Sequence, residues 1–172
     1  KDLFSLKTDF PILHARSNDP FHDLVVKAGS SDDELIMTDA SSGAAVLVVG
    51  RTPEPRMYDI YKTTPITEGQ QATKTTSDGT SLYLRAKLVM SDNDLKVFMD
   101  NQDEALYTVT KSPGLLNFST ARIIMMKGME KPVASTSDWE DTSYMLEIMP
   151  VVDAGLMMCL AICDDDFHTE EK

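Results

Sequence analysis

The sequence contains few of the residues that cross-link or interrupt a small fold. Among its 172 residues are only two cysteines and eight glycines. Cys159 and Cys163 lie four residues apart in a segment that we predict to be helical, where two buried thiols are expected rather than a mutual disulfide. Fibrous, low-complexity and disulfide-rich classes are therefore excluded, and one domain with an ordinary hydrophobic core is expected at this length.

Positive charge is also scarce. The chain has 16 basic and 28 acidic side chains, and its net charge of −12 opposes unspecific attraction to nucleic acid and to anionic lipid. No apolar run approaches the roughly 18 residues of a membrane-spanning helix, and no signal-like stretch opens the sequence. We therefore expect no nucleic-acid partner and no transmembrane segment. A cytoplasmic location is the default expectation, and a secreted one applies if a leader was removed before Lys1.

The motifs of common enzyme classes are missing as well. There is no nucleophile elbow, phosphate-binding glycine loop or zinc signature. His14, His22 and His168 fall in the two terminal segments, where exposure to solvent is expected. The consecutive carboxylates at 164–166 lack the alternating ligand spacing of a calcium loop, so solvent or nearby Lys and Arg side chains are expected to balance them. We predict a protein that is not an enzyme and that needs neither a metal nor a cofactor.

What the sequence does contain is a succession of short β-type segments. Residues 1–22 are predicted to form an extended N-terminal arm that leads into a domain over residues 23–167. Within that domain, β-branched and aromatic residues recur in short runs separated by turn residues, which is typical of antiparallel hairpins. The ten predicted strands are 24–27, 34–38, 45–49, 57–62, 72–76, 81–90, 95–99, 105–111, 121–127 and 143–149.

The C-terminal segment predicts one buried helix over about 153–163. Asp153 stands where an N-cap carboxylate accepts backbone N–H groups, and no charged residue follows before Asp164. A helix that is apolar on every side must be buried on every side, so we expect the strands to close around it as a β-barrel. An acidic tail is expected over 168–172. The core residues predicted for the helix are Leu156, Met157, Leu160 and Ile162, and methionines 125, 126, 145, 149, 157 and 158 are predicted to fill the core around it.

These features together resemble the tubby C-terminal-like superfamily, and within it the LURP-one-related family. The resemblance rests on the strand–turn–strand segment at 97–111, on its earlier counterpart at 35–49, and on Val152-Asp153-Ala154 leading into the apolar helix. It covers roughly residues 23–167. The family's hairpin glycine is absent from the turn at 101–104. The resemblance implies a closed antiparallel β-barrel around a central C-terminal helix.

Two functions from different classes follow. The first is a non-catalytic binding or adaptor domain, in defence or host–microbe interaction, that contacts a protein partner through the outer faces of its strands. The second is a phosphoinositide- or phospholipid-binding module, or a scramblase-like one. For the second, Tyr83, Arg85 and Lys87 are the predicted ligand site, because they alternate with apolar residues on one side of a strand. The resemblance supports this choice, since tubby proteins bind phosphoinositides with two basic residues two apart on a strand. The net charge of −12 favours the first function, and only weak phosphoinositide binding is expected.

Overall fold

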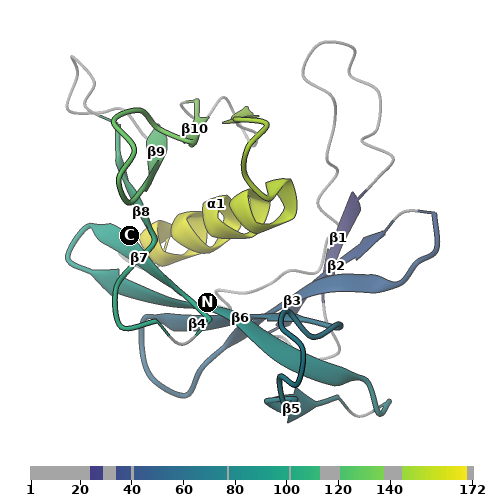
Figure 1. The fold of residues 1–172 in the computed structure, drawn as a ribbon. Helices are drawn as coiled ribbons and strands as arrows, with labels where there is room; N and C mark the ends of the chain where they lie inside the picture. The colour runs from purple at the N-terminus through teal and green to yellow at the C-terminus, as the bar shows by residue number, and fades with distance from the viewer. Residues whose placement is uncertain are drawn as a thin grey trace. The chain divides into compact units, whose positions relative to one another are not determined.

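The protein is mainly β, with antiparallel ladders and one C-terminal helix (Figure 1). The structure is a computed structural model that describes residues 24–28, 34–39, 41–76, 78–100, 102–112, 121–137 and 145–169. The predicted arm at 1–22 lies outside the described residues. The chain divides into two compact units, residues 1–87 and 88–172, and the long strand β6 runs across the boundary between them.

The first unit is a sheet in the order β1-β2-β3-β4-β6, and the short β5 pairs with β6 outside this path. The ladders that join β1 to β2, β2 to β3, β3 to β4 and β5 to β6 are all antiparallel. Each of the strands β1 to β6 overlaps a segment that the sequence predicted to be a strand. The bounds are β1 Leu24–Ala28, β2 Glu34–Asp39, β3 Ala45–Arg51, β4 Met57–Lys62, β5 Lys74–Thr75 and β6 Ser81–Ser91.

The hairpin between β2 and β3 is shaped by Asp39. Its Oδ1 accepts hydrogen bonds from the backbone N–H and the hydroxyl of both Ser41 and Ser42, over 2.6–3.1 Å. Gly43 follows at φ 67°, a left-handed conformation that glycine adopts at little cost. These hydrogen bonds stabilise the carboxylate, and they lower the pKa of Asp39 to about 2. The Asp-Ala-Ser-Ser-Gly sequence thus sets the turn by local chemistry.

The sheet of the first unit has apolar side chains on both sides. In the register of β3 and β4, Val49 pairs with Ile60 on one side, and Val48 pairs with Tyr61 on the other. All four side chains are buried. Leu82 and Leu84 from the start of β6 pack against Val48 and Tyr61. The hairpin of β5 and β6 therefore covers the second side of this sheet, which the sequence pattern did not indicate.

The second unit continues from the end of β6 in the order β6-β7-β8-β9-β10-β11. The sequence pattern missed one of these strands, β10, because its three residues, Ala-Ser-Thr, show no clear alternation. One register row crosses five strands through Leu95, Val109, Ile124, Ala134 and Ile148, and the first four are buried. This row defines the inner side of the sheet within the second unit. The bounds are β7 Asp94–Met99, β8 Tyr107–Lys111, β9 Arg122–Met126, β10 Ala134–Thr136 and β11 Leu146–Ile148.

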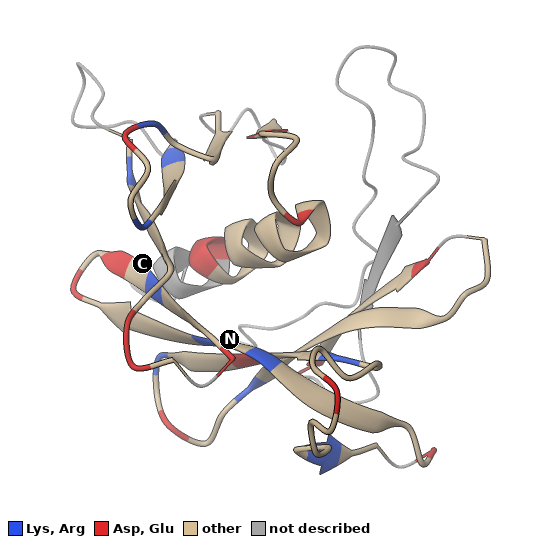
Figure 2. Ribbon diagram, viewed as in Figure 1, with Lys and Arg blue, Asp and Glu red and all other residues tan. Residues whose placement is uncertain are grey.

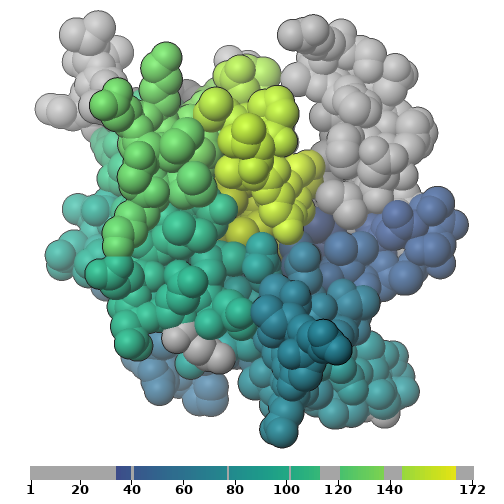
Figure 3. Space-filling view, in the orientation of Figure 1, coloured from purple at the N-terminus to yellow at the C-terminus, as the bar shows by residue number. Residues whose placement is uncertain are grey.

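The helix α1 spans Ala154–Thr169 and contacts β8 and β11 within the second unit. Figure 3 shows its side chains, in yellow, beside the green residues of that unit. Figure 2 shows acidic residues where the helix begins and in its C-terminal half, with none between. Leu156, Met157, Leu160, Cys159 and Cys163 are all fully buried. The segment predicted to be an apolar helix is therefore a helix whose side chains are almost all removed from water, with Met158 and Ile162 partly accessible.

The predicted end of the helix was wrong, since α1 continues six residues beyond Cys163. Three carboxylates had been expected just after the helix. Instead Asp164 is inside it, with a side chain 3% exposed and Oδ2 2.9 Å from Nε of Arg122 on β9. An acid that is paired in this way no longer opposes helix extension. His168 and Thr169, the first two residues of the predicted tail at 168–172, are helical, and residues 170–172 lie outside the described residues.

The hydrogen-bonded sheet is not closed in the part of the chain that the structure describes. There, β1 pairs only with β2 at one end of the strand order, and β11 pairs only with β10 at the other. An antiparallel β fold with one C-terminal helix is therefore established, whereas closure of the sheet into a barrel stays a prediction.

Candidate functional site

The residues predicted to bind an anion lie together on β6. Leu82, Leu84 and Ala86 are buried along this strand, and they alternate with less buried neighbours. Tyr83, Arg85 and Lys87 are those neighbours, so they project from the other side of β6. Only Lys87 is exposed, while Tyr83 and Arg85 are half-buried.

Arg85 carries an unmatched donor. Its Nε has no contact with solvent, and it makes no hydrogen bond with any residue that the structure describes. Buried polar groups are nearly always paired, and an unpaired one costs roughly 1–3 kcal/mol. An acceptor that reached this guanidinium would therefore gain more than at an ordinary surface arginine.

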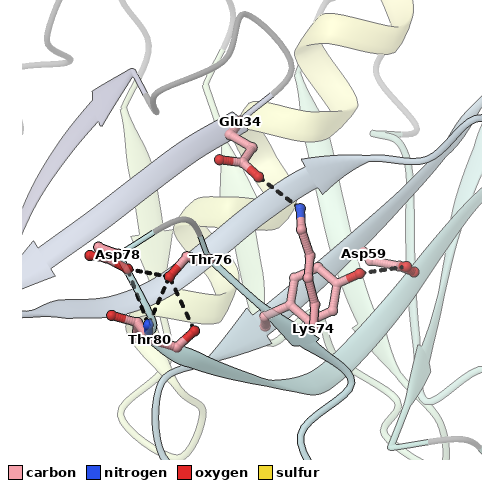
Figure 4. Close-up of polar contacts among 7 residues, drawn as sticks. Glu34, Asp59, Lys74, Thr76, Asp78 and Thr80 are labelled. Atoms are coloured by element: carbon pink, nitrogen blue, oxygen red, sulfur yellow. Dashed lines mark hydrogen bonds and ion pairs between the residues drawn. The ribbon is translucent and has the colours of Figure 1, made fainter.

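A polar network lies where the β5–β6 hairpin covers the first sheet (Figure 4). Nζ of Lys74 on β5 is 2.8 Å from Oε1 of Glu34 on β2, and the hydroxyl of Tyr61 donates to Oδ2 of Asp59 over 3.0 Å. Burial, followed by the neighbouring Asp59 carboxylate, raises the pKa of Tyr61, so the phenol stays protonated. In the turn that follows β5, the hydroxyl of Thr76 donates to Asp78. These contacts hold the hairpin in place. The carboxylates of Glu34, Asp59 and Asp78 already accept hydrogen bonds from within the protein.

The segment before β5 is fastened by the same kind of contact. Gln70 accepts from the N–H of Ile66 over 2.7 Å and donates to the carbonyl of Leu84 over 3.2 Å. The N–H of Thr73 donates to the carbonyl of Leu82 over 2.8 Å. Because one glutamine side chain bridges two backbone segments, we assign it a structural role.

The predicted helix residues have structural roles at the start and centre of α1. Asp153 accepts the N–H of Leu156 on Oδ1 over 3.1 Å, which is the geometry of an N-cap. Cys159 and Cys163 are free thiols in the buried part of the helix. Burial, with a smaller effect of the Asp153 charge, raises the pKa of Cys159 to about 12, so its thiol is protonated and inert at neutral pH.

The outer side of β11 is a surface that the sequence pattern did not identify. The predicted core residues Met145 and Met149 are 54% and 37% exposed, so that prediction was wrong for these two methionines. They alternate with the half-buried Leu146 and Ile148 and therefore lie on the same side as Glu147, which is exposed. The sequence could have predicted this exposure from the alternation of Met145, Glu147 and Met149. A glutamate that shares one side of a strand with two methionines indicates that this side faces water.

Uncharged residues continue this surface on the neighbouring strands. Across β10 and β9, the register places Ser135 and Ile123 beside Glu147 on the outer side. Ser135 and Ile123 are both partly accessible. Val151, 72% exposed, follows β11 in the connection to α1. We call Met145, Glu147 and Met149, with the backbone of β11, the β11 edge.

The described residues contain no group of three or more His, Cys, Asp or Glu side chains that could hold a metal ion. No helix among them combines the length and apolar character needed to cross a membrane.

Comparison with known proteins supports the fold and does not identify the family. No protein family and no curated protein matches the sequence. Among solved structures, the chain is similar to a protein from Arabidopsis thaliana, with a TM-score of 0.59 and 16% sequence identity. The match covers 96% of this chain and 98% of that one. At this identity the likeness defines a shared fold class and no shared activity.

Proposed function

We propose that this chain is a non-catalytic binding domain that contacts a protein partner through the outer face of its strands. The observation that carries the proposal is the β11 edge, where the large apolar side chains of Met145 and Met149 are exposed on the outer side of the strand. In a soluble domain, exposed apolar side chains gathered on one face mark interaction surfaces more often than isolated ones do. Methionine suits such a face because its flexible thioether adapts to different partners.

We also propose the finer fold and family that the sequence suggests. In this proposal the domain is a tubby C-terminal-like β-barrel of the LURP-one-related type, closed around α1, and it acts in defence or host–microbe interaction. What supports it is the order of strands, the capped apolar helix at the C-terminus and the hairpins at 35–49 and 97–111. Protection of the backbone amides of β1 and β11 from hydrogen exchange tests closure, since two open edges would exchange rapidly.

A second candidate function is binding of a phosphoinositide headgroup at Tyr83, Arg85 and Lys87. The observation that favours it is the unmatched, buried Nε of Arg85. Two cations give limited attraction, because each basic residue near an anionic bilayer contributes about 1 kcal/mol. A net charge of −12 opposes approach to that bilayer.

Co-sedimentation with liposomes that contain phosphatidylinositol bisphosphate at physiological salt separates the two functions. We expect no strong recruitment of the wild-type protein. Any weak binding should disappear in Arg85→Ala/Lys87→Ala and persist in Lys96→Ala/Lys131→Ala, which removes the same charge from two exposed lysines elsewhere. Tight recruitment that only the first pair abolishes would replace the protein-binding proposal by the lipid one.

A further inference from the structure

The methionines of this chain differ sharply in their access to water. The chain has eleven of them, and all lie among the described residues. The buried group comprises Met37, Met90, Met99 and Met157, none more than 7% exposed. The exposed group comprises Met129, Met145 and Met149, at 38%, 54% and 37%. A small oxidant in solution therefore reaches the exposed group in the folded protein, and it reaches the buried group only when the structure opens.

Hydrogen bonds fix β11 so that two exposed methionines share its outer side. The N–H of Met145 donates to Oγ of Ser137 over 2.9 Å, and the N–H of Ser137 donates to the carbonyl of Met145 over 2.8 Å. At the other end of the strand, the N–H of Met149 donates to the carbonyl of Val133 over 2.9 Å. Strands pair within the plane of a sheet, whereas side chains point out of it, so closure of a barrel at β11 does not cover this outer side.

We propose that Met145 and Met149 form a reversible oxidation site for hydrogen peroxide, and that their oxidation to sulfoxides weakens partner binding at the β11 edge. The second part rests on the proposed protein-binding function and names its regulation. In the reaction, the thioether sulfur donates an electron pair to one peroxide oxygen. An S–O bond forms as the O–O bond breaks, and the other oxygen takes the remaining proton and leaves as water. Sulfur is oxidised and peroxide is reduced, so no further reactant is needed.

The reverse reaction belongs to methionine sulfoxide reductases, one for each epimer of the sulfoxide. Two thiols supply the electrons: they become a disulfide, and the sulfoxide oxygen leaves as water. The modification is therefore reversible, as a regulatory change has to be.

Oxidation changes what the β11 edge offers to a partner. A thioether is apolar and flexible, whereas a sulfoxide is polar, and its burial in an interface is costly unless the partner supplies a hydrogen bond. Because Glu147 stands between the two methionines, the oxidised strand presents three polar side chains in a row. The fold itself is spared, since Met157 in α1 is fully buried and does not meet the oxidant.

Peptide mapping by mass spectrometry tests the oxidation site. The intact wild-type protein is treated with a series of hydrogen peroxide concentrations, and the sulfoxide at each methionine is measured over time. Met145 and Met149 should be oxidised on the order of ten-fold or more faster than Met37 and Met157. In denaturant this difference should disappear. Circular dichroism and thermal melting should show that the oxidised protein remains folded.

Peptides enriched from a displayed library of random dodecapeptides on the reduced protein serve as probes of binding. We expect enriched peptides whose affinity, measured by fluorescence anisotropy, falls on the order of ten-fold in Met145→Gln/Met149→Gln, which imitates the polar sulfoxides. Peroxide should weaken their binding to the wild-type protein equally, and treatment with both reductases and a thiol should restore it.

Two leucine variants separate this site from oxidation elsewhere. Met145→Leu/Met149→Leu keeps the surface apolar but cannot form a sulfoxide, so it should bind the same peptides and be insensitive to peroxide. Met129→Leu is the matched control, because Met129 is as exposed as Met149 but lies in the β9–β10 connection. It should remain as sensitive as the wild-type protein.

Three outcomes would overturn the proposal in distinguishable ways. If Met145 and Met149 are oxidised no faster than Met37 and Met157, there is no oxidation site, whatever the protein binds. If the enriched peptides bind the oxidised and reduced proteins equally, or the double leucine variant stays sensitive to peroxide, the regulation is refuted and the protein-binding function stands. If no peptide is enriched, the protein-binding function fails together with its regulation, while the peptide map still decides on the oxidation site.

Discussion

The ion pair between Arg122 and Asp164 offers a quantitative test of how α1 is held in the second unit. Arg122 lies on the inner side of β9, and its Nε is 2.9 Å from Oδ2 of Asp164 in the helix. The two side chains are 17% and 3% exposed. The carboxylate is therefore almost completely removed from water, while the guanidinium keeps partial access. Replacing Arg122 by Met preserves much of the side-chain volume but removes the cation.

The expected cost of Arg122→Met is about 3 kcal/mol. Removing one partner of a buried pair costs roughly 3–5 kcal/mol, because the remaining charge keeps its desolvation penalty without its counter-ion. The lower end applies here because Arg122 is partly accessible. Against a total of about 5–15 kcal/mol this is a large fraction. For a chain of this size it corresponds to a fall in Tm of roughly 6–12 °C.

A double-mutant cycle distinguishes the pair from a general packing effect. Chemical denaturation should show Arg122→Met and Asp164→Leu each destabilising, and the double variant recovering most of the loss, because two apolar residues leave no buried charge. Additive costs, or a loss below about 1 kcal/mol for Arg122→Met, would refute the view that this pair holds the acidic end of the helix in place.

Three further perturbations address the buried helix. Leu160→Asp should prevent folding, because an unpaired carboxylate at a fully buried position costs several kcal/mol; a soluble variant with a cooperative melt would contradict this. Cys159 and Cys163 should react slowly with a thiol reagent in native protein and rapidly in denaturant, and rapid native labelling would show that the helix is accessible. Because the folded pKa of Cys159 is raised to about 12 from 9.0, its contribution to stability is complete below about pH 9 and is lost as pH rises toward 12. Cys159→Ala should therefore reduce the alkaline slope of the unfolding free energy by up to about 1.4 kcal/mol per pH unit, and an unchanged slope would show that this thiol does not titrate between the two states.

The sequence predicted those elements that local pattern determines. The alternation of Leu82, Leu84, Ala86 and Leu88 predicted both the strand β6 and its buried side, because a strand exposes alternate residues to opposite sides. Asp153 predicted the N-cap of the helix, because its carboxylate can accept backbone N–H groups. The absence of any charged side chain from there to Asp164 predicted a buried helix, because a helix that is apolar on every side must be buried on every side. For β6 and for α1, the pattern of residues adjacent in the sequence was enough to predict the structure.

The sequence failed where a distant partner decides the outcome. Three acids at 164–166 look like the end of a helix, yet the counter-ion that keeps Asp164 inside α1 lies 42 residues earlier in the chain. For the same reason the pattern predicted one shared side for Tyr83, Arg85 and Lys87 but could not tell that only Lys87 would be exposed. That depends on which segments pack nearby, and alternation alone carries no such information.

The two units differ in how their strands are covered, and this difference supports our placing the proposed partner surface on the second unit. In the first unit, the side of the sheet that carries Val48 and Tyr61 is covered by the chain's own β5–β6 hairpin, and Lys74 and Glu34 fasten it. A partner that bound there would first have to displace those contacts. Beside β11, Met145 and Met149 are already exposed to water, so a partner could cover them without displacing contacts among the described residues. Affinity is greatest where binding breaks the least native structure, and this is why we propose the β11 edge, among the described residues, as the partner surface.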